Sequence, residues 1–162
     1  MKLIIAVLAA CLAVAALPAI AQEPAPVPPK VFSSAAEVQD MIASARAAHK
    51  PHTNTIRILA AYGDYPVQLE YRTDTTRPSL HKGHAELIYV IAGACTLVMG
   101  GTLVDAKPGP GFNMVGTSIA GGTRRKVAKG DYIMVPPDTP HQYADPDGEF
   151  IAMTIHVPTE AK

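Results

Sequence analysis

Beyond residue 54 the sequence is divided into short apolar segments by closely spaced glycine and proline residues. Segments typical of strands run over 55–61, 66–73, 86–91, 96–99, 102–104, 124–128, 132–135 and 150–157. The stretch 107–122 between them is rich in Gly and Pro, and we expect a long loop there. The 15 Pro and 12 Gly residues of the 162-residue chain are too many breakers for a helical bundle. Many short strands with frequent turns predict an all-β sandwich or barrel.

The first 21 residues have the pattern of a secretory signal peptide. Lys2 is followed by the uncharged segment 3–17 and then by Ala19-Ile20-Ala21, a small-x-small cleavage site. We expect cleavage after Ala21 and a periplasmic or secreted protein. The alternatives are an uncleaved membrane anchor, for which the apolar run is short, and lipidation at Cys11, which lies too early in that run.

Residues 22–33 read as a Pro-rich tether, and residues 34–54 as a helix with a linker. Ser34 and Glu37 have the spacing of a capping box, which predicts a helix from Ser34 to about residue 49. One face of this helix is apolar, at positions 38, 41, 42 and 45. We expect that face to pack on the outside of a β domain that spans 55–162.

Charge and cysteine content exclude several classes of protein. Lys and Arg total 14, and so do Asp and Glu, so the chain lacks the basic stripe of a nucleic-acid-binding protein. It also lacks a Gly-rich phosphate loop and a nucleophile-elbow serine. After cleavage only Cys95 remains, in a strand-like run. We expect it to be a buried thiol rather than a reactive one.

Two segments contain the residues that could bind a metal. The first, residues 80–93, reads LHKGHAELIYVIAG and contains His81, His84 and Glu86. The second, residues 130–145, reads GDYIMVPPDTPHQYAD and contains His141. Imidazole and carboxylate groups suit divalent Fe, Mn, Ni, Cu or Zn. Ligands from separate strands can converge in the concave interior of a barrel.

The spacing within these segments resembles the two motifs of the cupin superfamily. The first motif ends in Glu, six residues and Gly, which matches Glu86 and Gly93. The second is Gly, five residues, Pro, three or four residues and His, which matches Gly130, Pro136 and His141. The resemblance covers residues 66–157. It implies a cupin jelly-roll-like β-barrel with the N-terminal helix packed outside, a divalent transition metal inside the barrel, and a homodimer.

The first motif departs from that of metal-binding cupins, which have two His separated by one residue before the Glu. If His81 is the second of these, Ser79 occupies the position of the first. The resemblance therefore implies an incomplete set of His81, Glu86 and His141, with His84 as the fourth ligand. His84 shares a strand face with Glu86; alternatively it lies in an exposed turn over residues 82–84. Some cupins keep the fold and lose the metal.

Two further residues near the motifs have open roles. His156 lies opposite the apolar face formed by 151, 153 and 155, so we expect it at the surface. Tyr143 shares a face with His141 and either lines a pocket or fills the core.

Two functions follow from these expectations. The chain is either an exported cupin with a divalent-metal site inside the barrel, whose activity could be of the oxygenase, isomerase or lyase type, or a metal-free cupin module that binds a small ligand without catalysis. In both cases the expected partner is a small molecule, with no nucleic acid and, after cleavage, no membrane.

Overall fold

The computed structural model describes residues 29–159, which contain one helix and thirteen strands. The predicted signal peptide and most of the tether lie outside the described residues. The helix is α1 (Ala35–Ala48). The strands are β1 (Thr55–Tyr62), β2 (Tyr65–Arg72), β3 (Ser79–His81), β4 (His84–Ala92), β5 (Ala94–Met99), β6 (Thr102–Val104), β7 (Lys107–Pro108), β8 (Asn113–Val115), β9 (Ser118–Ala120), β10 (Thr123–Ala128), β11 (Tyr132–Val135), β12 (His141–Ala144) and β13 (Phe150–Pro158).

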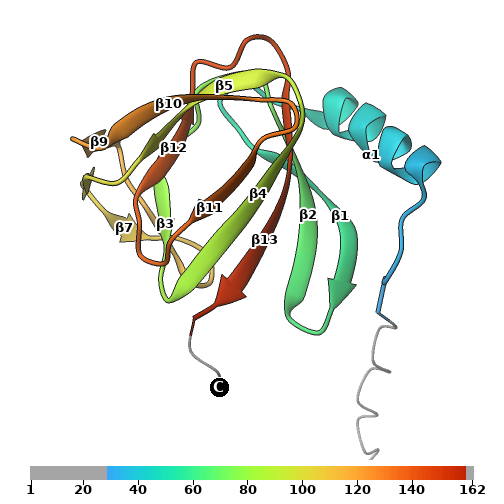
Figure 1. Cartoon of the computed structure of the whole chain (residues 1–162), viewed down its shortest axis with the longest axis horizontal. Coiled ribbons are helices and arrows are strands. Elements are labelled where there is room, and N and C mark those ends of the chain that lie inside the picture. Colours follow the sequence, from blue (N-terminus) through green and yellow to red (C-terminus); the bar gives the residue numbers. More distant parts are fainter. Residues whose placement is uncertain (1–28, 160–162) are drawn as a thin grey trace, which may run out of the picture.

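Two antiparallel sheets pack face to face, as Figure 1 shows. One has the strand order β1-β2-β13-β4-β11, and the other has the order β10-β5-β12-β3-β8-β7. A small third sheet pairs β6 with β9. This arrangement confirms the expected jelly-roll-like all-β fold. In the described part of the chain the sheets stay separate and do not close into one continuous barrel.

The core between the sheets is formed by apolar residues from β4, β5 and β10 to β13. Its fully or nearly fully buried members include Ile88, Val90, Leu97 and Phe150. Cys95 belongs to the same cluster and is a free, buried thiol, as predicted. Burial raises the pKa of this thiol to about 12, which keeps it protonated and unreactive near neutral pH.

The helix α1 lies on the outer face of the five-stranded sheet, beside β1 and β2 (Figure 1). Ser34 caps its first turn, and Ser34 and Glu37 form the predicted capping box. Ile42 and Ala45 are buried against Leu69, Tyr71 and Ile151 of that face. At this edge the sheet is therefore covered on both sides, by the core inside and by the helix outside.

The strand β13 lies at the centre of the five-stranded sheet, between β2 and β4. Because side chains alternate along a strand, its residues divide into two sets. Ile151 faces α1, whereas Phe150 and Ala152 belong to the inner core. The pairing register places His156 directly opposite Glu86 of β4. The inner face of β13 thus packs in the core at its start and places His156 beside Glu86 near its end.

The prediction of a long loop over 107–122 is wrong in part. This stretch contains the three short strands β7, β8 and β9. Each pairs with a neighbour of its own: β8 with both β3 and β7, and β9 with β6. Through these pairings β8 and β7 extend the six-stranded sheet beyond β3, and β9 belongs to the small third sheet.

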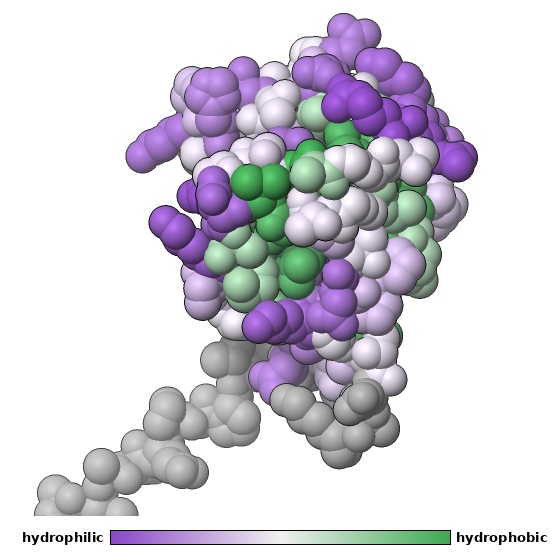
Figure 2. Space-filling view, turned by 90° about the vertical axis from the view of Figure 1, so that its left-hand side faces the viewer, coloured by the Kyte–Doolittle hydropathy of each residue, from purple (hydrophilic) through white to green (hydrophobic). Residues whose placement is uncertain are grey.

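Figure 2 views the molecule from the side of β7 and β9 and shows hydrophobic residues in the middle of that face, between hydrophilic margins. No helix within residues 29–159 is long and apolar enough to cross a membrane.

Candidate metal centre

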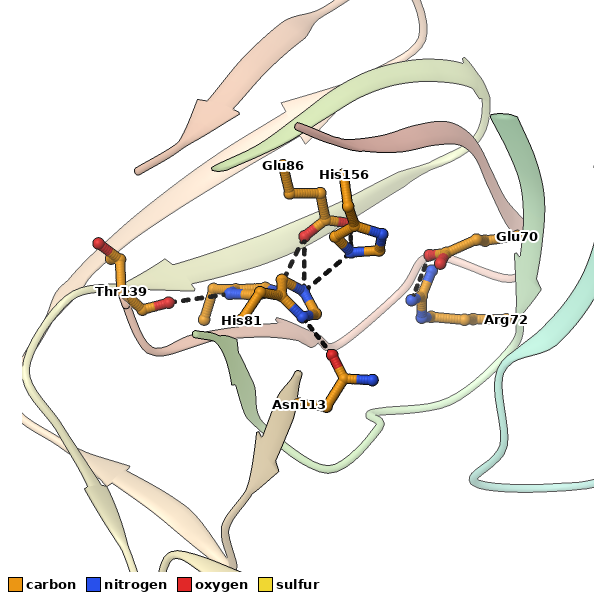
Figure 3. Close-up of polar contacts among 8 residues, drawn as sticks. Glu70, Arg72, His81, Glu86, Asn113, Thr139 and His156 are labelled. Carbon is orange, nitrogen blue, oxygen red and sulfur yellow. Dashed lines mark hydrogen bonds and ion pairs between the residues drawn. The ribbon is translucent and has the colours of Figure 1, made fainter. Parts of the chain in front are cut away.

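Three histidines and one glutamate converge where the two sheets face each other. His81 ends β3 and His141 begins β12, both in the six-stranded sheet. Glu86 lies on β4 and His156 on β13, both in the five-stranded sheet. Each sheet therefore contributes two side chains, and Figure 3 shows His81 and His156 pointing toward the Glu86 carboxylate.

The ligand atoms of this cluster lie close together. Glu86 Oε2 is 3.0 Å from His141 Nε2 and 3.2 Å from His81 Nε2. His156 Nε2 is 3.2 Å from His81 Nε2 and 4.0 Å from Glu86 Oε1. The Nε2 atoms of all three imidazoles thus point toward one carboxylate.

Two of the imidazoles are held by hydrogen bonds on their other ring nitrogen. His81 Nδ1 donates to Asn113 Oδ1 at 2.5 Å, and His141 Nδ1 donates to the Thr139 carbonyl at 3.1 Å. In the neutral imidazole these bonds place the proton on Nδ1 and leave a lone pair on Nε2. That lone pair faces a carboxylate oxygen, which is also an acceptor, so a proton or a cation is needed between them.

The cluster is buried, and burial shapes its charges. The side chains of Glu86 and His141 are each 3% exposed, and that of His156 is 15% exposed. Burial alone would raise the pKa of Glu86, but its contacts with His141 and His81 lower it well below the usual range. Burial lowers the pKa of His141, yet the Glu86 carboxylate outweighs this and the net pKa is raised. Glu86 is therefore ionised and attracts a positive charge.

The donor set fits a divalent first-row metal. Three imidazole nitrogens and one carboxylate oxygen are ligands that such ions prefer. One ligand atom each from His81, Glu86 and His156 lies within 4.8 Å of the other two. Asn113 and the Thr139 carbonyl supply the outer hydrogen bonds that usually orient metal-binding histidines.

His84 lies apart from this cluster, although it lines the same cavity. Its Nδ1 contacts the Lys82 carbonyl at 2.7 Å, and its ring stacks on Phe112 with the centroids 3.8 Å apart. The structure thus brings together His81, Glu86 and His141 of the predicted set, and it places His156 where His84 was expected.

The expectation that His156 lies at the surface is wrong. The apolar residues at 151, 153 and 155 indicated which face of β13 is buried, but the start of β13 is buried on both faces. The outer face packs under α1 through Ile151, and the inner face carries the small residues Ala152 and Thr154 before His156. A usable signal was present: Phe150, a large core residue, has the same strand parity as His156.

A cavity of about 970 Å³ opens beside the cluster. It is lined by all four cluster residues and by residues of β2, including Gln68, Glu70 and Arg72. Tyr143, for which two roles were open, fills both: it is buried in the core and also lines the cavity. The cavity is large enough for a small organic molecule next to the cluster.

No protein-family model matches the sequence, and no curated protein matches it. Solved structures with similar folds include a proposed sugar phosphate isomerase from Acidithiobacillus ferrooxidans (17% identity, 78% of this chain and 74% of that chain covered, TM-score 0.49). A cupin superfamily protein from Desulfitobacterium hafniense (14% identity, 68% and 82% covered, TM-score 0.46) is also similar. So is a predicted oxalate decarboxylase from Thermotoga maritima (9% identity, 65% and 80% covered, TM-score 0.47). The described part of this chain has a jelly-roll-like fold of two facing sheets, with residues of both motif segments lining one cavity.

Proposed function

We propose that this chain is a cupin-type metal-binding protein that holds one divalent transition metal, Fe, Mn, Ni, Cu or Zn, with His81, Glu86, His141 and His156. The observation that carries the proposal is the set of Nε2 atoms facing the Glu86 carboxylate while two Nδ1 atoms are tied to outer acceptors. The Nε2 lone pairs and the Glu86 carboxylate are all acceptors and repel one another. A divalent cation bound between them would remove this repulsion and balance the buried negative charge.

A bound ion of this kind would supply Lewis acidity to a small molecule in the adjoining cavity. The chain itself contributes the orientation of the imidazoles through Asn113 and Thr139, and it limits water around Glu86 by burial. The cavity beside the cluster gives a small molecule access to it. Whether this molecule is turned over or only bound is decided by assay of the metal-loaded protein.

The test is the metal content of the full chain, purified without chelator and then loaded separately with each candidate ion. We expect about one ion per chain for at least one metal in the wild type. His141→Ala and His156→Ala should each lose most of it, because each removes one member of a small ligand set. The matched control is His84→Ala, which removes an imidazole from the same cavity but outside the cluster and should keep the metal.

Two outcomes would refute the site. The first is a wild-type protein that binds none of the ions. The second is a His141→Ala or His156→Ala protein that retains the full metal content.

A metal-free binding module is the second candidate, and the 3.0 Å contact between His141 Nε2 and Glu86 Oε2 favours it. A protonated His141 can donate to Glu86 through Nε2 and satisfy the buried carboxylate without a metal. In that case the metal content stays near zero, and Glu86→Gln should alter the binding of a small ligand rather than the binding of an ion.

Export through residues 1–21 is part of the proposal and rests on the uncharged run that ends in Ala19-Ile20-Ala21. The protein recovered outside the cytoplasm should begin at Gln22, and N-terminal sequencing measures this. An exported protein that begins at Met1, or one lipidated at Cys11, would contradict this.

A further inference from the structure

Arg72 is a buried cation on the wall of the cavity beside the cluster. Its side chain is 6% exposed, and its Nη2 donates to Glu70 Oε2 at 2.5 Å. Its Nε and Nη1 atoms have no hydrogen-bond acceptor among residues 29–159. Buried N–H groups nearly always have a partner, so this guanidinium lacks an acceptor that something else must provide.

Tyr143 lies against the same guanidinium and also has a polar group without a hydrogen-bond partner. The Arg72 guanidinium carbon is 4.0 Å from the centroid of the Tyr143 ring. The Tyr143 hydroxyl is buried and has no partner within the described part of the chain. A phenol hydroxyl is a hydrogen-bond donor. Arg72 and Tyr143 both line the cavity, and they lie against each other there.

This donor pair lies next to the proposed metal centre. Tyr143 follows His141 by two residues on β12, so both side chains are on one face, and their ring centroids are 6.3 Å apart. Glu70 and Arg72 lie on β2, which is separated from Glu86 on β4 only by β13. Figure 3 shows the Glu70–Arg72 pair to one side of the cluster.

The buried charges around the cavity favour an anion. Arg72 and Glu70 cancel each other, whereas a divalent ion at Glu86 leaves one net positive charge. The other charged groups on the cavity wall, Asp64 and Arg77, are exposed, and solvent screens them. Because a guanidinium donates along fixed directions in one plane, it matches a carboxylate better than a neutral group.

We propose that Arg72 and Tyr143 form a carboxylate-binding subsite, and that the cavity takes a small organic acid whose carboxylate lies against them while its other end reaches the cluster. This inference rests on the proposed function, because the metal supplies the net positive charge and the second anchor point. It names the substrate class of the site: small molecules that carry a carboxylate.

The test uses the metal-loaded full chain and isothermal titration with succinate and with its neutral counterpart succinamide. The wild type should bind succinate at least tenfold more tightly than succinamide. Arg72→Met should abolish this preference while the metal content stays unchanged. The matched control is Arg77→Met, the same substitution at an exposed arginine of the same cavity, which should leave the preference within about twofold of the wild type.

A second variant covers the case in which Arg72→Met does not fold, because that change leaves Glu70 buried without its partner. The double variant Glu70→Met/Arg72→Met removes the whole ion pair, a replacement that buried pairs commonly tolerate. It should bind metal and lose the preference for succinate. A double variant that keeps the preference, or a wild type that binds both probes equally, would overturn the subsite.

Metal analysis of the same samples separates the two proposals. A wild type that prefers succinate through Arg72 but contains no metal would refute the metal centre and the anchoring of the acid by the metal, and it would leave only the recognition of the carboxylate by Arg72. A wild type that contains metal but shows no preference dependent on Arg72 would refute the subsite and leave the metal centre in place.

Discussion

Asn113 is the residue that decides how His81 presents its Nε2 atom. Its side-chain oxygen accepts from His81 Nδ1 at 2.5 Å, and it begins β8, which pairs with β3 beside His81. The bond joins the stretch expected to be a loop to the start of the first motif segment. An outer acceptor of this kind fixes both the tautomer and the angle of the ring.

We expect Asn113→Leu to weaken the binding of the divalent metal about 10- to 100-fold, because His81 is then free to rotate or to change tautomer. Asn113→Asp keeps an acceptor at the same position and should bind nearly as well as the wild type. Competition with a chromogenic chelator measures both affinities. Equal affinity of Asn113→Leu and the wild type would show that this bond does not orient the ligand.

Gly93 joins β4 to β5 and adopts a φ of 78°, in the region that favours glycine. A Cβ atom placed there would lie 1.9 Å from the Glu149 carbonyl oxygen. The glycine of the first motif is therefore required by the close passage of the chain before β13. The resemblance identified its position, and the structure supplies this physical reason.

Gly93→Ala should reduce the free energy of unfolding by about 3 kcal/mol, from backbone strain and the contact with Glu149 combined. Gly63→Ala is the matched control: its φ is 55°, but no atom lies within 4 Å of the added Cβ, so only the strain of about 1 kcal/mol remains. Urea denaturation of both variants gives the comparison. Equal losses at the two positions would rule out the contact as a cause.

At the scale of elements, α1 is joined to the rest of the fold by polar contacts as well as by its apolar face, and one of these contacts involves Glu149. Arg46 in its last turn forms an ion pair with Glu149, and Arg46 Nη2 lies 2.7 Å from Glu149 Oε2. Tyr71 of β2 donates to the other oxygen of Glu149 at 2.6 Å. The residue before β13 thus joins the helix to the sheet.

This contact should make stability depend on pH. The hydrogen bond from Arg46, followed by that from Tyr71, lowers the pKa of Glu149 from 4.5 to about 2. A lowered carboxyl pKa stabilises the fold above the unfolded pKa, and that contribution is lost as the pH falls toward the folded pKa. The difference in unfolding free energy between the wild type and Glu149→Gln should therefore be constant above pH 4.5 and shrink between pH 4.5 and 2.

The side chains of Arg46 and Glu149 are 54% and 39% exposed, so solvent screening keeps this difference small. Asp145→Asn is the matched control, since Asp145 pairs with Arg124 at 2.9 Å in a more exposed position. It should change stability less than Glu149→Gln at neutral pH. Denaturant titrations at several pH values provide the measurement, and a difference that grows on acidification would contradict the assignment.

The elements that the sequence predicts are those whose signals are local. The helix has its capping box and an apolar face, and the motif strands around Glu86 and His141 have fixed spacings between turn residues. The strands β7, β8 and β9 have two or three residues each and exist because distant partners pair with them. His156 was missed for a related reason: which face of β13 turns inward depends on α1 and on the register with β4.

At the scale of the whole molecule, the proposed metal links the two sheets. His81 and His141 come from one sheet, and Glu86 and His156 come from the other. An ion bound by all four stabilises the folded state only, because the unfolded chain does not hold them together. Thermal stability should therefore depend on the metal.

A metal at 100 times its dissociation constant adds about 2.7 kcal/mol to the free energy of unfolding, which raises the melting temperature by about 5 to 10 °C. Calorimetry of the wild type, before and after removal of the ion with a chelator, measures this shift. His156→Ala should melt at the same temperature in both states, whereas His84→Ala should show the full shift. A wild type that contains metal but melts at an unchanged temperature would mean that the ion does not bridge the sheets.

The central position of β13 sets when the cluster can assemble during synthesis. This strand follows all the other described strands in the chain, yet it lies between β2 and β4 and brings His156 to Glu86. A ribosome therefore releases the rest of the domain before the fourth side chain can take its place. If the chain crosses a membrane unfolded, as the export proposal implies, it meets its metal in the compartment where it folds. The ions available there, more than the intrinsic affinities of the ligands, would then select the metal that this protein carries.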